Sequence, residues 1–505
     1  MSILIKNAYV LTLDDENKIY EKGEIFIEGD RIKQVGNNLD ISECHACEVI
    51  DAENMLVMPG LVNSHTHSYA SYLKGSCDNL AGDIFMLYTH TGSIKRTPRE
   101  VYVSTLTNLI EQLKYGNTTV VDHFSQKPQE MEYLDATVQA CLDSGVRSMV
   151  APMFTDKRYY ETIPAKTETW PQWLMEELNK QSPPSLKDYY DFCLEAIDKW
   201  NGKEGMVKIT IGTDAANRCS EELLKLTADL MEKTGVGIHT HALESKTQFI
   251  QSMDKYGKTI IDYMDEFGLL GNKSALAHLV WLTDGDIQKC ADKGVKMIHS
   301  PNALIVGPGF TPLRKYMEAG ISVGIGSEGS NLGNLSIFDA MRMVALMQSI
   351  YEPNYDRWVS AKETIKMATV GGARIYGGEN DFGTLEEGKK ADIIFLDMNT
   401  PNLKPLGNLI NQLVYNENGC SVRHAIVNGK KVLENGKVTL VNEDELLEEA
   451  NEISKKFRMD NNKLEFIEKQ VPYFRKMYFD AMSRDVGLNR FVAPHSEYIR
   501  NIPKE

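Results

Sequence analysis

Cysteine is scarce in this chain, which has eight cysteines in 505 residues. That number is too small for the disulfide framework that stabilises small secreted domains. Long apolar runs are missing as well, because no uninterrupted stretch reaches the roughly 18 residues that suggest a membrane span. The first residues, MSILIKNAYVLTL, contain neither a basic leader before a long apolar core nor a small-residue cleavage site. These absences favour a cytoplasmic protein that does not bind a membrane.

Positive charge is in deficit. The chain has 55 Lys and Arg against 71 Asp and Glu, which gives a net charge of −16 and a pI near 5.3. Nucleic acids and anionic membranes would repel such a chain, so neither is expected as a partner. Hydrophobic residues make up 42% and charged residues 25%. This composition is typical of globular proteins and excludes a disordered, collagen-like or coiled-coil chain.

The two ends of the chain have strand-like patterns. Residues 1–58 contain apolar or alternating stretches such as EIFIEGDRI, and residues 378–440 contain ADIIFLDM and HAIVNGKKVL. We expect both ends to form one small β-sandwich, with a large domain inserted between them. Residues 441–505 are expected to form a helical C-terminal extension, because DELLEEANEISKKF carries an apolar stripe at helical spacing.

The middle of the chain, residues 59–377, alternates short apolar strands with amphipathic helical stretches. Parallel strands need helical crossovers, so this rhythm indicates an α/β fold. Eight candidate strands are present, from VMPGLVN to ISVGIGS, and eight strand-helix units match a closed (β/α)8 barrel of the TIM type. We therefore predict such a barrel for this region.

Polar side chains occur at the C-terminal ends of the predicted strands. The active sites of such barrels lie at that face, so these side chains are expected to converge. In chain order they are His65, His67, Asp122, His123, Asp214, His239, His241, His278, His299 and Glu328.

The first pair, His65-Thr66-His67, has the spacing of a metal site. Residues i and i+2 of a strand point the same way, so both imidazoles can reach one cation. Imidazole suits zinc or iron. An HxH sequence also arises by chance. Its position at the end of the first predicted strand favours a metal site over a chance occurrence.

Further candidates follow along the barrel. His241 can supply a third imidazole, and Glu244 is placed to move protons beside a metal-activated water. The alternative for Glu244 is an acid that stabilises a helix N-terminus. His278 either orients the attacking water or contacts the substrate, unless it is a core residue. The same alternatives hold for His299.

Glu328 ends the eighth predicted strand in GIGSEGSN, where it can serve as the last metal ligand and as a base. The same stretch contains a GxGxxG pattern. We do not interpret it as a dinucleotide site, because no second strand ending in an acid follows. No lysine ends the fourth strand, where binuclear barrel hydrolases place a carboxylated bridge, and Asp214 lies there instead. We therefore expect one divalent ion, Zn²⁺ first and Fe²⁺ as the alternative.

Several motifs together resemble the amidohydrolase superfamily, in particular its branch of triazine hydrolases, guanine deaminase and S-adenosylhomocysteine-type deaminases. The resemblance covers residues 1 to about 435. The motifs are VMPGLVNSHTHS, GNTTVVDH, HTHALES, AHLVWLT, HSPNAL and GTLEEGKKADIIFLD.

The resemblance implies roles for the candidates. It makes His65, His67 and His241 metal ligands, Glu244 the proton shuttle, and His278 the group that orients the nucleophile. Glu328 stands where the family normally has an aspartate, so its part as ligand, base or neither is left open. The expected substrate-binding residues are His239, His299, Asp214, Trp281, Phe85 and Tyr88.

The implied activity is that of a metal-dependent amidohydrolase acting on carbon–nitrogen bonds other than peptide bonds. Metal-bound hydroxide would attack an amino-substituted N-heterocycle (a purine, pterin, pyrimidine or triazine-like ring) and release ammonia or an amine. The alternatives are hydrolysis of a cyclic amide or chloro-heterocycle by the same site, and a metal-binding barrel with impaired catalysis. The stretch TDAANRCS lacks the Pro-His-rich sequence of several deaminases in this branch, which favours triazine-type over adenosine-type substrates.

Two further expectations concern loops and assembly. The segment from Asp156 to Pro184 is long and aromatic, so it either closes over a flat heterocycle or packs as a helical lid or subunit contact. The resemblance also implies a homo-oligomer, a dimer or larger.

Overall fold

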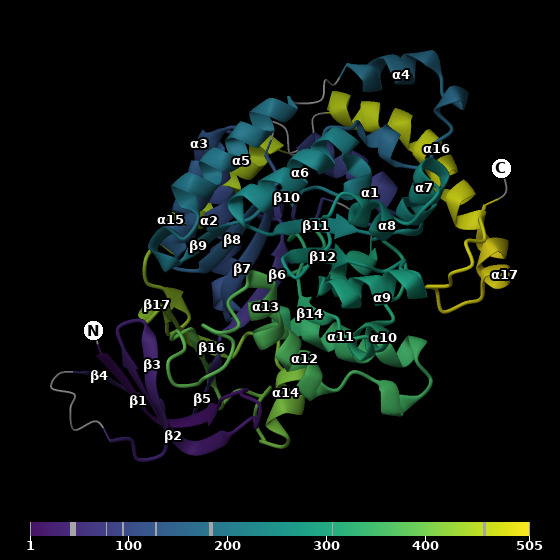
Figure 1. Cartoon of the computed structure of the whole chain (residues 1–505). Coiled ribbons are helices and arrows are strands. Elements are labelled where there is room, and N and C mark those ends of the chain that lie inside the picture. The colour runs from purple at the N-terminus through teal and green to yellow at the C-terminus, as the bar shows by residue number, and fades with distance from the viewer. Residues whose placement is uncertain are drawn as a thin grey trace.

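The computed structural model describes residues 2–40, 47–76, 78–92, 95–126, 129–180, 185–305, 307–457 and 461–503. Figure 1 shows strands from the two chain ends, purple and green, gathered at one end of the molecule. A ring of strands and helices forms the middle, and the yellow C-terminal helices lie on its outside. No helix within the described ranges is both long and apolar enough to cross a membrane.

The middle part is a parallel barrel with eight strand positions, the fourth of which is split into two short strands. One sheet has the order β10-β8-β7-β6, with β9 beside β8, and the other has the order β11-β12-β13-β14. The strands are β6 (Leu61–Thr66), β7 (Asn117–Phe124), β8 (Arg147–Phe154), β9 (Val207–Ile209), β10 (Gly212–Thr213), β11 (Ile238–Ala242), β12 (Ser274–His278), β13 (Lys296–His299) and β14 (Ser322–Ile325).

Backbone hydrogen bonds join the two sheets on both sides. On one side, parallel bridges link Ile211 to Ile238 and Ala215 to His241. On the other, the N–H groups of Ser327 and Glu328 both donate to the carbonyl of His65 at 3.1 Å. The predicted (β/α)8 barrel is therefore confirmed, and the seam on the second side runs through residues that also carry the candidate site.

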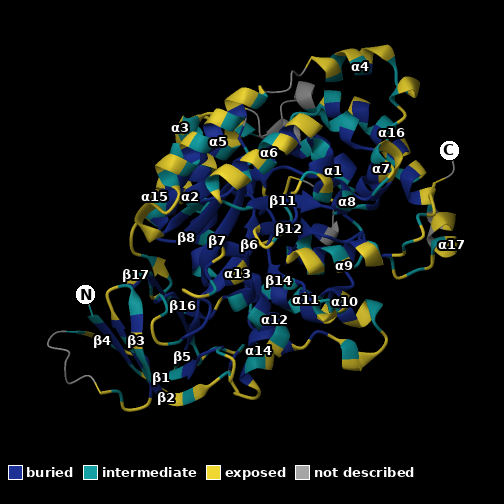
Figure 2. Cartoon of the chain, in the orientation of Figure 1, coloured by how far each residue is buried: buried dark blue, intermediate teal, exposed yellow. Residues whose placement is uncertain are grey.

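Helices cover the outside of the barrel, and their ends follow the local sequence. Thr97 and Glu100 form a capping box at the start of α2, and Gly235, with φ of 71°, ends α6 in a left-handed conformation. Figure 2 shows buried strands inside and helices with exposed outer faces. These helices include α2 (Pro98–Lys114), α3 (Met131–Ser144), α5 (Leu186–Trp200), α6 (Glu221–Thr234), α7 (Lys246–Tyr256), α8 (Ile260–Glu266), α9 (Asp284–Lys293), α11 (Ile337–Tyr351) and α12 (Ala361–Lys366).

The chain ends combine into one nine-stranded sheet, with the order β18-β17-β16-β15-β5-β1-β2-β3 and β4 beside β1. Its central seam is the antiparallel pair β5–β15, in which Val57 faces Phe395, and residues of both ends share one apolar core. The expected module built by both ends is confirmed, and hydrogen bonds connect it into a single sheet. Its strands are β1 (Ser2–Leu11), β2 (Ile19–Glu28), β3 (Arg31–Gly36), β4 (Glu48–Asp51), β5 (Met55–Pro59), β15 (Ile393–Asp397), β16 (Val422–Val427), β17 (Lys430–Glu434) and β18 (Lys437–Val438).

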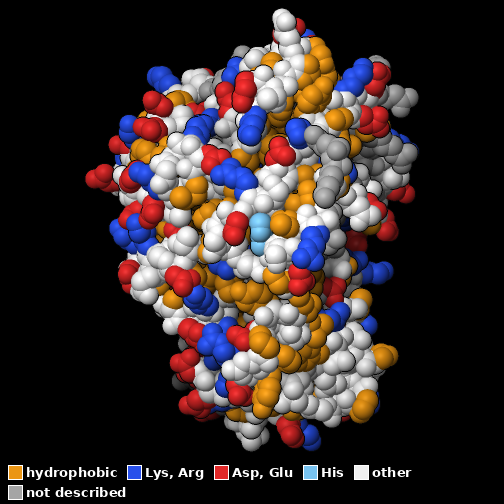
Figure 3. All heavy atoms as spheres, turned by 90° about the vertical axis from the view of Figure 1, so that its right-hand side faces the viewer, with side chains coloured by type: hydrophobic (Ala, Val, Ile, Leu, Met, Phe, Trp, Pro, Cys, Tyr) orange, Lys and Arg blue, Asp and Glu red, His pale blue; other side chains and the backbone are white. Residues whose placement is uncertain are grey.

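The C-terminal extension consists of α15 (Glu443–Phe457), α16 (Asn461–Ser483) and α17 (His495–Tyr498). Helix α15 packs against α2, and α16 packs against α7 and α1 (Gly82–Gly92). Beyond α16, the Arg490 guanidinium donates to the carbonyls of Val280 at 2.8 Å and Leu282 at 2.5 Å. The extension therefore lies over the C-terminal rim of the barrel. Figure 3 shows this side of the molecule, where acidic and basic side chains alternate with apolar ones over the surface.

Candidate active site

Six buried histidines converge inside the barrel, each from the end of a strand. The ring centroid of His65 lies within 6 Å of all the others, at 4.8 Å from His67, 5.9 Å from His123, 5.1 Å from His239, 5.0 Å from His241 and 5.8 Å from His278. Burial lowers the pKa of His278 and His239 to about 3, so both rings are neutral near pH 7. Neutral imidazoles offer lone pairs to a cation.

The carboxylate of Glu328 faces this cluster. Its Oε1 lies 3.2 Å from Nε2 of His65, and its Oε2 lies 3.6 Å from Nε2 of His67. Glu328 has a φ of 66°, a left-handed conformation that is uncommon for a residue with a Cβ. Such backbone conformations cluster at functional sites, where the surrounding structure enforces them.

Backbone acceptors orient two of the imidazoles. Nδ1 of His67 donates to the carbonyl of His123 at 2.9 Å, and Nδ1 of His241 donates to the carbonyl of Asp214 at 2.7 Å. A histidine that donates through Nδ1 keeps its lone pair at Nε2, which is the arrangement seen in metal-ligating histidines.

Asp214 links this cluster to a buried arginine. Its carboxylate lies 2.9 Å from Nη1 of Arg218 and 3.3 Å from Nδ1 of His241. Burial by itself would raise the pKa of Asp214, but the Arg218 charge and the His241 hydrogen bond hold it well below its usual range. Asp214 is thus a fixed negative charge beside the histidines.

The donor set fits a divalent cation of the zinc type. In the described part of the chain, three groups of side chains bring ligand atoms within 4.8 Å of one another: His65 with His67 and Glu328, His65 with His241 and His278, and His65 with His123 and His239. Nε2 of His65 and Oε1 of Glu328 are buried and have no hydrogen-bond partner among the described residues. Nitrogen and carboxylate oxygen donors are those that zinc takes in catalytic sites.

Glu244 lies at the edge of the same cluster. Its backbone N–H donates to Oε1 of Gln248 at 3.0 Å, and Nε2 of Gln248 donates back to its carboxylate at 3.3 Å. Burial raises the pKa of Glu244, so its carboxyl group is closer to accepting a proton near neutral pH than an exposed glutamate is.

A cavity opens above the histidines. Its apolar wall includes Phe85, Met153 and Tyr159, while Asp83 and Arg218 supply polar groups. The carboxylate of Asp83 accepts hydrogen bonds from the hydroxyl groups of Thr247 and Tyr159, both at 3.3 Å. Burial raises the pKa of Asp83 to about 6. His67, His241, Glu244, His278 and Glu328 line the same cavity.

The other predicted substrate-binding residues have different positions. Phe85 and Asp214 line the cavity, and His299 lines a small adjoining cavity together with Glu244 and His278. His239 lies behind His65, where their ring nitrogens are 2.8 Å apart. Two aromatic residues are not brought to the cavity: Trp281 is fully buried against Phe491, and Tyr88 lines a separate groove with Tyr72 and Phe457.

The aromatic segment that follows β8 packs mainly against the C-terminal helix α16. Tyr159 reaches the cavity, and its ring stacks with Phe474 at 6.0 Å. Trp170 contacts Phe474 at 5.1 Å and Trp173 contacts Tyr473 at 6.3 Å between ring centroids. The start of the segment therefore forms part of the cavity wall, while its tryptophans pack on α16. Residues 181–184 lie outside the described ranges.

Some residues of the site had no role in the sequence-based prediction. His123 was expected only as a strand-end residue, although its position after Asp122 is the same kind of signal that selected His65. Gln248 lies in the first turn of α7, and its side chain reaches back to Glu244, which precedes the helix. Asp83 comes from α1, and no local motif identifies it.

Comparisons with known proteins agree with this geometry. The family model described as "Amidohydrolase family" matches residues 56–432. A 5'-deoxyadenosine deaminase of Methanosarcina acetivorans is 31% identical over 452 residues, which cover 89% of this chain and 96% of the relative. A 5-methylthioadenosine/S-adenosylhomocysteine deaminase of Caldanaerobacter subterraneus subsp. tengcongensis is 32% identical, covering 87% and 95%. Among solved structures, an atrazine chlorohydrolase from Arthrobacter aurescens TC1 in complex with zinc superposes with a TM-score of 0.79 at 28% identity, covering 90% of this chain and all of that one.

Proposed function

The chain belongs to the amidohydrolase family, and we propose that it is a metal-dependent hydrolase that removes an amino group from an N-heterocycle. The substrate class is a purine, pterin, pyrimidine or triazine-like ring, and the leaving group is ammonia or an amine. The observation that carries the proposal is the meeting of three imidazoles with the carboxylates of Glu244 and Glu328 at the base of one cavity.

We assign the metal site to His65, His67, His241 and Glu328, with zinc as the expected ion. The orphaned Nε2 of His65 and Oε1 of Glu328 support this assignment, as does the zinc in the similar chlorohydrolase. A divalent cation in such a site lowers the pKa of water towards neutrality and so supplies a nucleophile at physiological pH.

The two glutamates then divide the proton transfers. Glu328 lies 3.6 Å from Nε2 of both His67 and His278, which places it to accept a proton from the attacking water. Glu244, whose pKa burial raises, would deliver its proton to the ring nitrogen and regain one from the hydroxyl added to the ring carbon. The proton held by Glu328 would pass to the departing amine. Gln248 holds the carboxyl group of Glu244 in place.

Neutral His278 orients the nucleophile. Its Nε2 faces Oε1 of Glu328 at 3.6 Å, and it lines the same cavity as Glu244. The charge that develops on the ring in the transition state needs donors fixed in advance, and a buried neutral imidazole meets that need without reorganisation.

The cavity walls favour a flat, polar ring. Phe85, Met153 and Tyr159 present apolar surface to the faces of a heterocycle, while Asp83 and Arg218 present opposite charges at its edge. The relatives named as deaminases act on adenosine analogues by their names, and the similar solved enzyme on atrazine, so both ring types belong in the first screen.

Ammonia release by zinc- or iron-loaded protein tests the proposal. The panel holds aminated purines, deoxyadenosine-type nucleosides, pterins, pyrimidines and triazines, each with and without a chelator. We expect chelator-sensitive ammonia or amine release from at least one compound, and none from Glu244→Gln. Chloride release, or acid formation from a cyclic amide, would favour the alternative hydrolysis. Silence on every compound with metal bound would support a barrel with impaired catalysis.

A further inference from the structure

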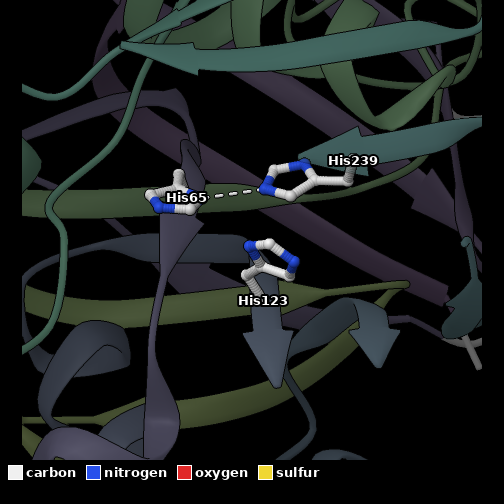
Figure 4. Close-up of side chains that lie close together, drawn as sticks. All are labelled: His65, His123 and His239. Carbon is white, nitrogen blue, oxygen red and sulfur yellow. Dashed lines mark hydrogen bonds between the residues drawn. The ribbon is translucent and has the colours of Figure 1, made fainter. Parts of the chain in front are cut away.

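We propose that His65, His123 and His239 form a second, inner site for a transition-metal cation, behind the site assigned above. The three residues come from β6, β7 and β11, and Figure 4 shows their rings facing one another inside the barrel. The proposal concerns metal binding alone, so it does not depend on which reaction the outer site performs.

The spacing of the three rings fits a shared ligand. One nitrogen from each residue lies within 4.8 Å of the others. Nδ1 of His65 is 2.8 Å from Nε2 of His239, and the ring centroid of His123 is 5.1 Å from that of His239. Imidazole nitrogen is a good ligand for zinc, copper, nickel and iron, so the class of cation follows from the donor type.

Unmet hydrogen-bonding capacity at this cluster is the second observation. Within the described part of the chain, both ring nitrogens of His123 and Nδ1 of His239 are buried with no hydrogen-bond partner, and the two residues are 0% and 1% exposed. Buried polar groups in native proteins are almost always satisfied, by protein, water or an ion. A cation held between the three rings would satisfy the lone pair of His123, which no neighbouring side chain serves.

His65 belongs to both sites through its two nitrogens. Its Nε2 faces Glu328 at 3.2 Å and its Nδ1 faces His239 at 2.8 Å. When Nε2 is a ligand of the outer site, Nδ1 carries the ring proton and donates it to His239. A cation in the inner site would replace this hydrogen bond, and the proton of Nδ1 would leave to solvent.

The expectation of a single ion rested on the missing lysine at the end of the fourth strand. The absence of this lysine excludes only a pair of metals bridged by it. The inner cluster needs no lysine, because its donors come from the first, second and fifth barrel strands, and His123 and His239 are not used by the outer site.

Access to the inner cluster from the opposite end of the barrel is electrostatically unfavourable. A cavity there reaches His239 but is also lined by Lys208, Lys273 and Lys296. Cations are repelled by three ammonium groups. We therefore expect the inner cation to exchange more slowly than the outer one, so that a chelator should strip the protein in two phases.

Metal counting on the full chain tests the proposal. Protein stripped by a chelator is titrated with Co²⁺ while visible absorption is followed, and bound metal is measured by mass spectrometry after gel filtration. We expect two equivalents per chain. His123→Asn and His239→Asn should each bind one, whereas His299→Asn, a change of the same kind at a barrel histidine outside all three groups of ligand atoms, should still bind two.

The outcomes separate this proposal from the proposed function. Saturation of the unsubstituted protein at one equivalent of Co²⁺ would overturn the inner metal site. An ordered water would then occupy the inner cluster, and the outer site would be unaffected. This measurement uses the unsubstituted protein. Its result therefore decides the question even if His123→Asn fails to fold. Two equivalents in a protein that deaminates nothing would support the inner site and count against the assigned reaction.

Discussion

Nε2 of His278 lies 3.6 Å from Oε1 of Glu328, and both residues adopt left-handed backbone conformations, with φ of 79° and 66°. The imidazole of His278, at the end of the sixth strand, and the carboxylate of Glu328, just beyond the eighth strand, therefore point toward each other. Residues with a Cβ hold such conformations only where the surrounding structure enforces them. The pair gives the first prediction.

Removal of the charge of Glu328 should abolish most activity. In Glu328→Gln the amide keeps the shape but cannot accept the proton, and a general base contributes about 10²–10⁴-fold. Glu328→Asp keeps a carboxylate, and aspartate is tolerated in the left-handed region, so it should retain more activity than Glu328→Gln. Steady-state kcat on the substrate found by the ammonia screen checks both. Equal activity of Glu328→Gln and the unsubstituted chain would exclude a role as base.

Asp214→Asn should weaken metal binding and stability together. The change leaves Arg218 buried without its partner, which typically costs about 3–5 kcal/mol. It also disturbs the acceptor beside His241, and losses of this kind lower metal affinity by about 10–100-fold. Competition with a chromophoric chelator measures the affinity, and urea unfolding measures the stability.

A matched control exists where the barrel meets the sheet of the chain ends. Arg147 and Asp392 form another buried pair, with Nε of Arg147 2.8 Å from Oδ2 of Asp392, and neither residue lines the histidine cavity. Asp392→Asn should lower stability by a similar amount and leave the metal affinity unchanged. If both variants lose metal equally, general unfolding explains the effect of Asp214→Asn.

Gly307→Ala should slow the reaction without unfolding the protein. A Cβ at this position would lie 2.9 Å from the carbonyl oxygen of Glu244 and 3.0 Å from its Cγ, so the carboxyl group must move. A displacement near 1 Å can cost roughly 10²-fold in rate, and we expect kcat to fall much more than KM changes. Gly271→Ala is the control, because a Cβ added there would meet no atom within 4 Å. An unchanged kcat in Gly307→Ala would contradict a positioned Glu244.

Asp83 should make stability fall as the pH rises from about 4 to about 6. Its folded pKa is about 6, above the unfolded value near 3.9, so the folded state binds more protons in this window. The contribution is present below the unfolded pKa and is lost as the pH rises through the folded pKa, on the order of 3 kcal/mol in all.

The variant Asp83→Asn isolates this effect, since its amide resembles the neutral acid. Urea unfolding at pH 4.5, 5.5 and 7 should show a flatter profile for Asp83→Asn than for the unsubstituted chain. Other titrating groups are common to both proteins and largely cancel in the difference. Parallel profiles would show that Asp83 is ionised in the folded protein throughout.

Much of the site could be predicted from the sequence, because two local patterns indicate where its residues lie. Alternation of short apolar strands with helices gave the barrel, and the rule that its strand ends meet at one face brought His65, His241 and Glu328 together. The structure has this convergence, whereas the chemical roles of these residues stay predictions.

Aromatic residues were harder to place. Trp281 stands three residues beyond the end of the sixth strand, yet its ring packs against Phe491 from the tail, 210 residues later. Tyr88 likewise turns to a groove shared with α15. The direction of such a side chain depends on the distant segment that packs over it. The residues next to it in the sequence do not show which segment that is. The same holds for Asp83, which reaches the cavity only because α1 is held against α16.

The pairing of β5 with β15 joins residue 57 to residue 395, and this has a consequence for synthesis on the ribosome. The first strands emerge long before their partner, so the edge of β5 stays open while the whole barrel is translated. Open strand edges invite pairing with other chains, and contacts so distant in sequence form slowly. We expect newly made chains to depend on chaperones until residues near 430 have emerged, and slower translation of the barrel region to lower the soluble yield.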